Sequence, residues 1–132
     1  MKNRRAAVYG TVLVLVHLLV NIVHGAAHSE LHIGLDAGEK RFVAAVILAG
    51  PLVAMAPLWT SRQRLGLGWL AATMLGSMVF GLYHHFVAMG PDHVAAQAPG
   101  AWGAVFVVTA SLLFLIEAIG TYSAVRWLRA VR

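Results

Sequence analysis

Histidine is the residue whose number and spacing in this chain point most directly to chemistry. The 132-residue sequence contains seven histidines and no cysteine. Its first long apolar segment carries four polar side chains at intervals of four, three and four residues: His17, Asn21, His24 and His28. At about 3.6 residues per turn these positions share one face of a helix. His24 and His28 have the spacing at which two imidazoles bind one metal ion from one helix face.

A second pair of histidines lies toward the end of the third apolar segment. A helical rise of about 1.5 Å per residue places His84 about 27 Å from Gly66, and His24 about 27 Å from Ala6. Adjacent residues on a helix point about 100° apart, so we expect only one of His84 and His85 to face inward. The sequence therefore predicts a metal site near one end of a helical bundle, with six candidate histidine ligands: His24, His28, His84, His85, His32 and His93.

The types of the candidate ligands narrow the metal without fixing it. Imidazole with carboxylate support from Glu30 or Asp92 suits zinc or iron, and an open position on the ion would allow hydrolytic or hydration chemistry. Copper is a third option, because thioethers suit copper(I) and the segment that carries His85 also has a methionine stripe. That stripe comprises Met74, Met78 and Met89. The alternative is that these are interfacial histidines hydrogen-bonded to backbone, water and carboxylates.

Haem b is the alternative cofactor. It would be held by one histidine from each of two facing helices, and the protein would then carry electrons. Small residues could leave room for the macrocycle, and two outer cations could meet its propionates: Gly25, Ala26, Gly76 and Gly81, with Lys40 and Arg41.

Glu117 is the only formal charge inside the last apolar segment. Helical rise places it about 14 Å from Arg126, and His17 about 16 Å from Ala6. Equal depth predicts an intramembrane hydrogen bond between His17 and Glu117. This pair could relay a proton or ion, or it could be a structural clasp between the first and last segments.

The elements that position these groups are four apolar segments. Hydrophobic residues make up 60% of the chain and charged residues 11%, which is typical of a membrane protein. A membrane-spanning helix needs roughly 20 apolar residues. The composition predicts an all-α, integral membrane four-helix bundle that forms a single domain, residues 1–132. Its spans are expected at about residues 6–28, 42–59, 66–89 and 101–125.

The basic residues predict the orientation of this bundle. Eight of the ten fall on one side of it: Lys2, Arg4, Arg5, Arg62, Arg64, Arg126, Arg129 and Arg132. By the positive-inside rule, both termini are expected in the cytoplasm of a bacterial inner (plasma) membrane, with the histidine-rich end facing outward. The lipid bilayer is then the expected partner, and nucleic acid is not. The first apolar segment resembles a signal peptide, but its length and its polar interruptions favour a retained span.

These observations favour a small membrane protein that binds a transition metal, and they leave open whether it is an enzyme. A haem b electron carrier is one alternative. A non-catalytic subunit or assembly factor is another, in a homo-oligomer or a larger membrane complex. A third is a pH-responsive transporter, because histidines titrate near neutral pH.

Overall fold

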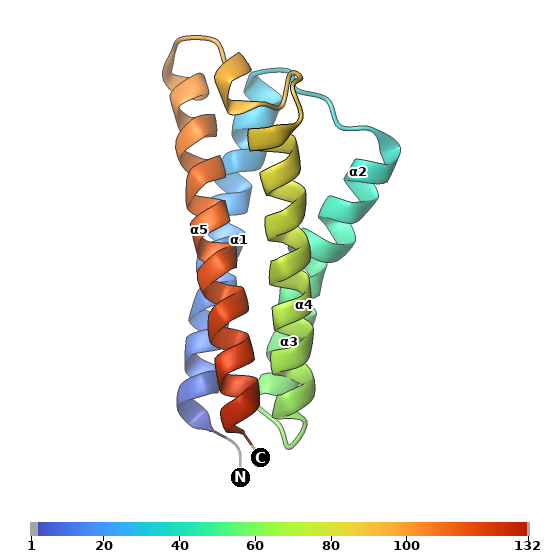
Figure 1. Cartoon of the computed structure of the whole chain (residues 1–132), viewed down its shortest axis with the longest axis vertical. Helices are drawn as coiled ribbons and strands as arrows, with labels where there is room; N and C mark the ends of the chain where they lie inside the picture. The colour runs from blue at the N-terminus through green and yellow to red at the C-terminus, as the bar shows by residue number, and fades with distance from the viewer. Residues whose placement is uncertain (1–2, 132) are drawn as a thin grey trace.

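A computed structural model describes residues 3–131, and these residues form an all-helical bundle. Four helical segments are long and apolar enough to cross a membrane, as the sequence predicted: Arg4–Glu30, Ala37–Leu58, Gln63–Val87 and Ala101–Ala130. The segments run alternately up and down, and the start of the first lies beside the end of the last (Figure 1). We call this the terminal end of the bundle and the opposite one the distal end.

The segments are built from the following elements. The first is α1 (Arg4–Glu30), and the second combines α2 (Ala37–Phe42), the π-helix η1 (Val43–Ala49) and α3 (Gly50–Leu58). The third combines α4 (Gln63–Leu82) with the π-helix η2 (Tyr83–Val87), and the short 3₁₀ helix η3 (Val94–Ala96) follows in the distal loop. The fourth is α5 (Ala101–Ala130).

The second segment starts earlier than the span expected from about residue 42. Asp36 accepts a hydrogen bond from the Glu39 backbone, and the Glu39 side chain accepts one from the Asp36 backbone. This capping box satisfies two backbone donors and starts the helix at Ala37, five residues before the apolar run that begins at Phe42. The polar start of α2 therefore extends the second segment beyond its apolar run.

Glycine allows a close contact between α3 and α4. A Cβ atom at Gly66 would lie 2.9 Å from the backbone nitrogen of Leu58 and 3.0 Å from the carbonyl oxygen of Ala54. Backbone atoms cannot move aside as a flexible side chain can, so this contact requires a residue without a side chain. The two helices are thereby fixed at short range near the terminal end.

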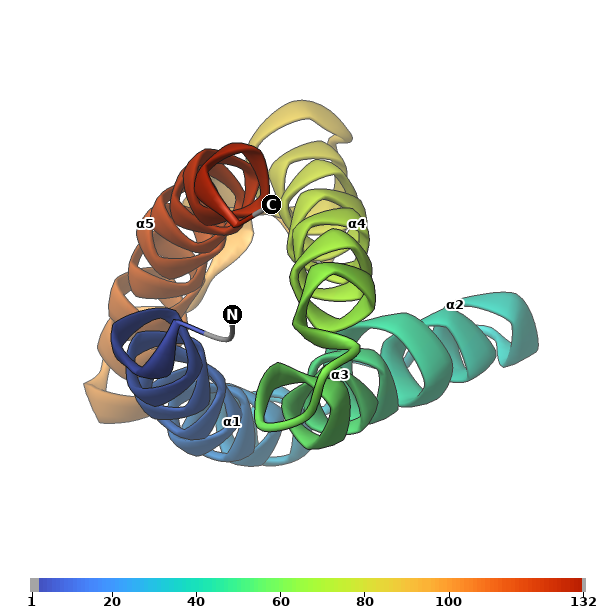
Figure 2. The same ribbon diagram turned by 90° about the horizontal axis from the view of Figure 1, so that it is seen from below.

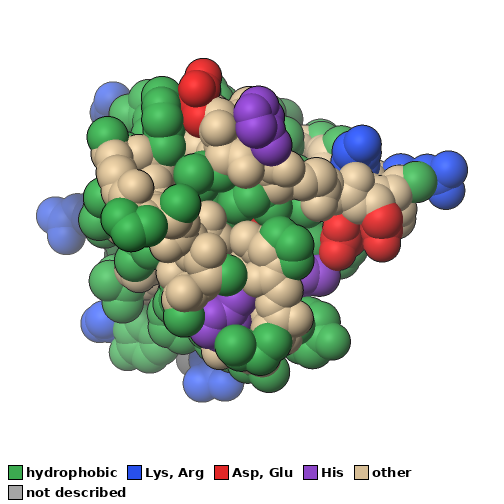
Figure 3. Space-filling model, turned by 90° about the horizontal axis from the view of Figure 1, so that it is seen from above, with side chains coloured by type: hydrophobic (Ala, Val, Ile, Leu, Met, Phe, Trp, Pro, Cys, Tyr) green, Lys and Arg blue, Asp and Glu red, His purple; other side chains and the backbone are tan. Residues whose placement is uncertain are grey.

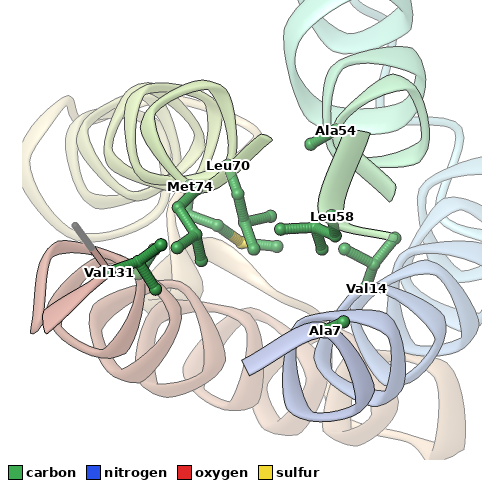
Figure 4. Close-up of a cluster of buried hydrophobic side chains, with 9 residues drawn as sticks. Ala7, Val14, Ala54, Leu58, Leu70, Met74 and Val131 are labelled. Atoms are coloured by element: carbon green, nitrogen blue, oxygen red, sulfur yellow. The ribbon is translucent and has the colours of Figure 1, made fainter. Parts of the chain in front are cut away.

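The apolar core lies in the terminal half of the bundle. Figure 4 shows side chains from α1, α3, α4 and the C-terminal end pointing toward one another. Leu58, Leu70 and Met74 are at most 1% exposed, and Val14 is equally buried. The terminal half is therefore the closely packed part of the structure.

The distal half is more open, because α2 leans away from the other helices (Figures 1 and 2). The C-terminal end of α2 is held by Phe42, whose ring stacks on that of Phe80 in α4 at 4.9 Å between centroids. Seen from the distal end, acidic and basic side chains gather over the part of the surface formed by α2 (Figure 3). Beside this splayed segment the bundle encloses a cavity of about 350 Å³.

Candidate metal centre

Three histidines from two elements converge in the distal half. His24 and His28 come from α1 and His85 from η2, and one ring nitrogen of each lies within 4.8 Å of the others. The ring centroid of His24 is 4.9 Å from those of His28 and His85. We call these three residues the histidine cluster; nitrogen ligands at this separation could hold a single metal ion.

Of the two adjacent histidines in the π-helix η2, only one reaches the cluster. His85 points inward and is 7% exposed. His84 lies on another face, where its Nδ1 is 3.5 Å from Glu39 Oε1. The extra residue of a π-turn changes the direction of the side chains that follow, and such turns are frequent at functional sites.

The cluster contains buried polar atoms that nothing in the described chain satisfies. Among residues 3–131, the buried side-chain nitrogen and oxygen atoms without a hydrogen-bond partner are His24 Nε2, His28 Nδ1 and Asp92 Oδ1. A buried polar atom left without a partner costs about 1–3 kcal/mol. Their concentration in one place indicates a site for a bound group, because an ion or water would satisfy them.

Thr109 in α5 fixes the tautomer of His24. The Thr109 hydroxyl donates to backbone carbonyl oxygens of α5, at 2.7 Å from Val105 and 3.1 Å from Phe106. With its hydrogen donated to Val105, the shortest of its contacts, the Thr109 oxygen accepts from His24 Nδ1, which lies 2.8 Å away. His24 Nε2 is therefore unprotonated, with a free lone pair, as a metal ligand requires.

Asp92, in the distal loop, holds the other two histidines. The His85 Nδ1 donates to the backbone carbonyl of Asp92 at 3.1 Å, which leaves Nε2 with its lone pair. The Asp92 carboxylate Oδ1 lies 3.2 Å from His28 Nε2 and 3.3 Å from His85 Nδ1, within ion-pair range but without hydrogen-bond alignment to either. Burial raises the pKa of Asp92, but the contacts with His85 and the other histidines of the cluster outweigh burial and hold that pKa below its usual range. Asp92 is thus a carboxylate at neutral pH and an outer partner of two histidines of the cluster.

Phe106 forms an apolar floor under the cluster. Its ring is fully buried, and its centroid lies 4.8 Å from that of His24, 5.1 Å from His28 and 5.4 Å from His85. Contact with all three imidazoles restricts their rotation and keeps water away from one side of the cluster. Fixed rings in a site of low polarity favour metal binding.

The other candidate ligands of the sequence lie away from the cluster. The α1 helix ends at Glu30, which is exposed, and His32 follows with a left-handed backbone (φ 55°) and an exposed side chain. His93 caps η3 by accepting a hydrogen bond from the Ala95 backbone at 3.1 Å. The structure therefore brings together His24, His28 and His85, with Asp92 beside them.

The methionine stripe does not converge on the histidine cluster. Met74 lies in the apolar core of the terminal half, and Met89 is 81% exposed at the distal end. Met78 is half-buried on α4 between these two positions. Helical spacing aligned these residues on one face of the segment, but that face meets different surroundings along its length.

The expected contact between the first and last segments is present, nearer the terminal end than the histidine cluster. His17 Nε2 lies 3.0 Å from Glu117 Oε1, and both side chains are at most 4% exposed. The Asn21 amide donates to the His17 backbone carbonyl at 2.9 Å and also lies 3.1 Å from Nε2. Asn21 and Glu117 line the same cavity as the histidine cluster, so its wall carries polar groups at two depths.

Replacement of Thr109 by valine tests whether its hydroxyl group supports metal binding by accepting a hydrogen bond from His24 Nδ1. Loss of the acceptor for His24 Nδ1 is expected to lower metal affinity by about 10- to 100-fold, the usual cost of removing the partner of a metal-bound histidine. The affinity is measured by competition with a chelating dye. Thr109→Ser keeps the hydroxyl and should bind normally. Ser111→Ala removes a similar hydroxyl-to-backbone bond on α5 and is the matched control.

Neither Thr109 nor Phe106 was among the candidates from the sequence. Both lie in an apolar helix where threonine and phenylalanine are ordinary residues, so their type alone carries no signal. Their positions three apart on α5 become informative only once α1 is known to pack against that face.

Comparison with known proteins gives no relative for this chain. It matches no family model, no curated protein and no solved structure. Its function is therefore argued from the geometry of the histidine cluster.

Proposed function

We propose that this chain is an integral membrane protein that binds one transition-metal ion through His24, His28 and His85. The observation that carries the proposal is the convergence of three histidine nitrogens within 4.8 Å at the place where the buried unsatisfied atoms gather. The tautomers support it, since Thr109 and Asp92 each bond one imidazole and leave its other nitrogen free.

The donor set favours zinc or iron over copper. Three imidazoles with a carboxylate oxygen nearby are typical of zinc, and imidazole with carboxylate also suits iron(II). No thioether lies in the cluster to favour copper(I). A bound ion also explains the cluster better than haem b, because three rings surround one point instead of two rings facing each other across space for a macrocycle.

The open side of the cluster supports a metalloenzyme as the finer proposal. Catalytic zinc sites have three protein ligands and an open position, whereas structural sites are closed by four. Here the cavity adjoins the cluster, and a metal-bound water there would have its pKa lowered to about 7. A metal-binding subunit of a larger complex is the competing proposal, and it predicts co-purification with that complex.

The orientation follows from charge. Arg62, Arg64, Arg126 and Arg129 lie at the terminal end, whereas the distal end has only Lys40 and Arg41 among the described residues. We propose that the terminal end faces the cytoplasm of a bacterial inner membrane and that the histidine cluster faces outward.

The first test is metal analysis of protein purified without a histidine tag. Elemental analysis should find about one zinc or iron per chain, a stoichiometry set by the single cluster, and the absorption spectrum should lack a Soret band. A Soret band that changes on reduction would replace the proposed ion with haem. Protein that binds neither metal nor haem, even after incubation with each metal, would overturn the proposal.

A further inference from the structure

The cavity beside the histidine cluster is lined by two chemically different sets of residues. One set is polar and comes from α1, η2 and α5, and it includes His24 and His85. The other set is apolar and comes from η1 and the middle of α5: Val43, Ile47, Leu48, Leu113 and Phe114. A ligand that satisfies both sets has a polar end and a hydrocarbon part.

Lys40 brings a positive side chain to the lining of this cavity, which also includes the carboxyl groups of Asp92 and Glu117. It is the only lysine or arginine that lines the cavity within residues 3–131, and no carboxylate there lies within 4.0 Å of its amino group. The neighbouring Glu39 pairs with His84 instead. An anionic group between Lys40 and a divalent ion in the cluster would be attracted by both.

The cavity reaches the part of the bundle beside the splayed α2 segment. There it is lined by the chain between α1 and α2, at Ile33, Gly34 and Leu35. In the proposed orientation this part of the cavity lies toward the outward-facing end of the bundle. A lipid-soluble molecule could enter from that side without crossing the packed terminal half.

We propose that this cavity binds a single-chain amphiphile with an anionic head group, taken from the outer half of the membrane. The head lies between Lys40 and the metal site, and the chain lies along η1 and Phe114. The proposal rests on the proposed metal site and adds the class of molecule presented to it. The volume of about 350 Å³ is at the lower end of the range of about 300–1,000 Å³ for small-molecule sites, which fits a short chain better than a two-chain lipid.

Photo-crosslinking in lipid nanodiscs tests this binding. The probe is decanoic acid with a diazirine at the end of its chain, and mass spectrometry locates the labelled residues. Labelling is expected at Ile47, Leu48 or Phe114. Unlabelled decanoate should compete, and the cation decyltrimethylammonium should not, because Lys40 and the metal repel it. Labelling only of lipid-facing side chains, or equal competition by both amphiphiles, would overturn the proposal.

Two pairs of variants separate the cavity from general effects on the membrane protein. Gly25 lines the cavity and Gly68 does not, yet a Cβ atom at either meets no heavy atom within 4 Å. Gly25→Phe should therefore abolish cavity labelling, and Gly68→Phe should leave it unchanged. Lys40→Gln should raise the decanoate concentration for half-competition by about threefold or more, whereas Arg41→Gln removes the same charge outside the cavity and should not.

Metal content measured on each sample distinguishes failure of this inference from failure of the proposed function. If the protein contains metal but its cavity is not labelled, the amphiphile proposal is overturned and the metal site is not. Labelling that persists in Gly25→Phe also overturns the amphiphile proposal. Protein that binds no metal but retains labelling blocked by Gly25→Phe supports the cavity ligand and overturns the metal site.

Discussion

Replacing His85 by alanine is expected to lower the affinity of the protein for zinc or iron by more than about 100-fold, the upper end of the cost of losing only an outer partner. The reason is that His85 is the ligand supplied by a second element. Without it, α1 alone would offer two nitrogens. His24→Ala and His28→Ala should have similar effects, and titration with competing chelators measures all three.

Matched controls come from the histidines outside the cluster. His84→Ala changes the adjacent residue, which contacts Glu39, and should leave metal affinity within a few-fold of the original. His32→Ala and His93→Ala should behave in the same way. Equal losses in His84→Ala and His85→Ala would contradict the assignment of ligands.

The stability of the metal-free protein gives an independent readout for this prediction. His24 Nε2 and His28 Nδ1 are buried without partners, so each costs free energy until a metal satisfies it. Removal of one such imidazole should therefore lower the melting temperature of the metal-loaded protein much more than that of the chelator-treated protein. A histidine that only packs would lower both equally.

Periodicity explains why part of the site could be predicted. His24 and His28 are separated by one helical turn within an uninterrupted α-helix, so their common face follows from spacing alone. The depth of His17 and Glu117 could be counted in the same way, and their side chains meet at 3.0 Å. In a regular helix the face and the depth of each residue can therefore be counted from the sequence.

The unpredicted features lie where regular helix stops. His84 and His85 both lie in a π-turn, where the spacing of a regular α-helix does not hold, so the sequence left open which of the two faces inward. His32 lies beyond the end of α1, where one left-handed residue turns the chain away. The helix start at Ala37 did have a signal, the Asp36 and Glu39 capping box, which hydropathy does not detect.

The terminal half of the bundle is closely packed, whereas the distal half carries the polar groups of the candidate site. Glycine contacts and buried apolar side chains fix the terminal half, as at Gly66 and Leu58. The distal half instead holds unsatisfied imidazoles, two π-helices and a cavity. Unsatisfied groups and an open cavity cost stability, so a well-packed terminal half is needed to hold them in place.

Glu117→Ala is expected to destabilise the bundle strongly. It would leave His17, which is 1% exposed, without its carboxylate partner, and a buried polar group left without its hydrogen-bond partner costs about 1–3 kcal/mol. Glu117→Gln keeps an oxygen that can accept from His17 Nε2 and should cost less. Unfolding in mixed micelles with increasing SDS measures the free energies.

A double-mutant cycle decides whether the loss belongs to the pair. His17→Ala in the Glu117→Ala background should cost much less than it does alone, because the imidazole has already lost its partner. Glu30→Gln removes an exposed carboxylate and should change stability by less than about 0.5 kcal/mol. Additive effects of the two alanine substitutions would show that His17 and Glu117 do not stabilise the bundle as a pair. A large cycle energy would identify them as the clasp between α1 and α5, on which the position of the histidine cluster above them depends.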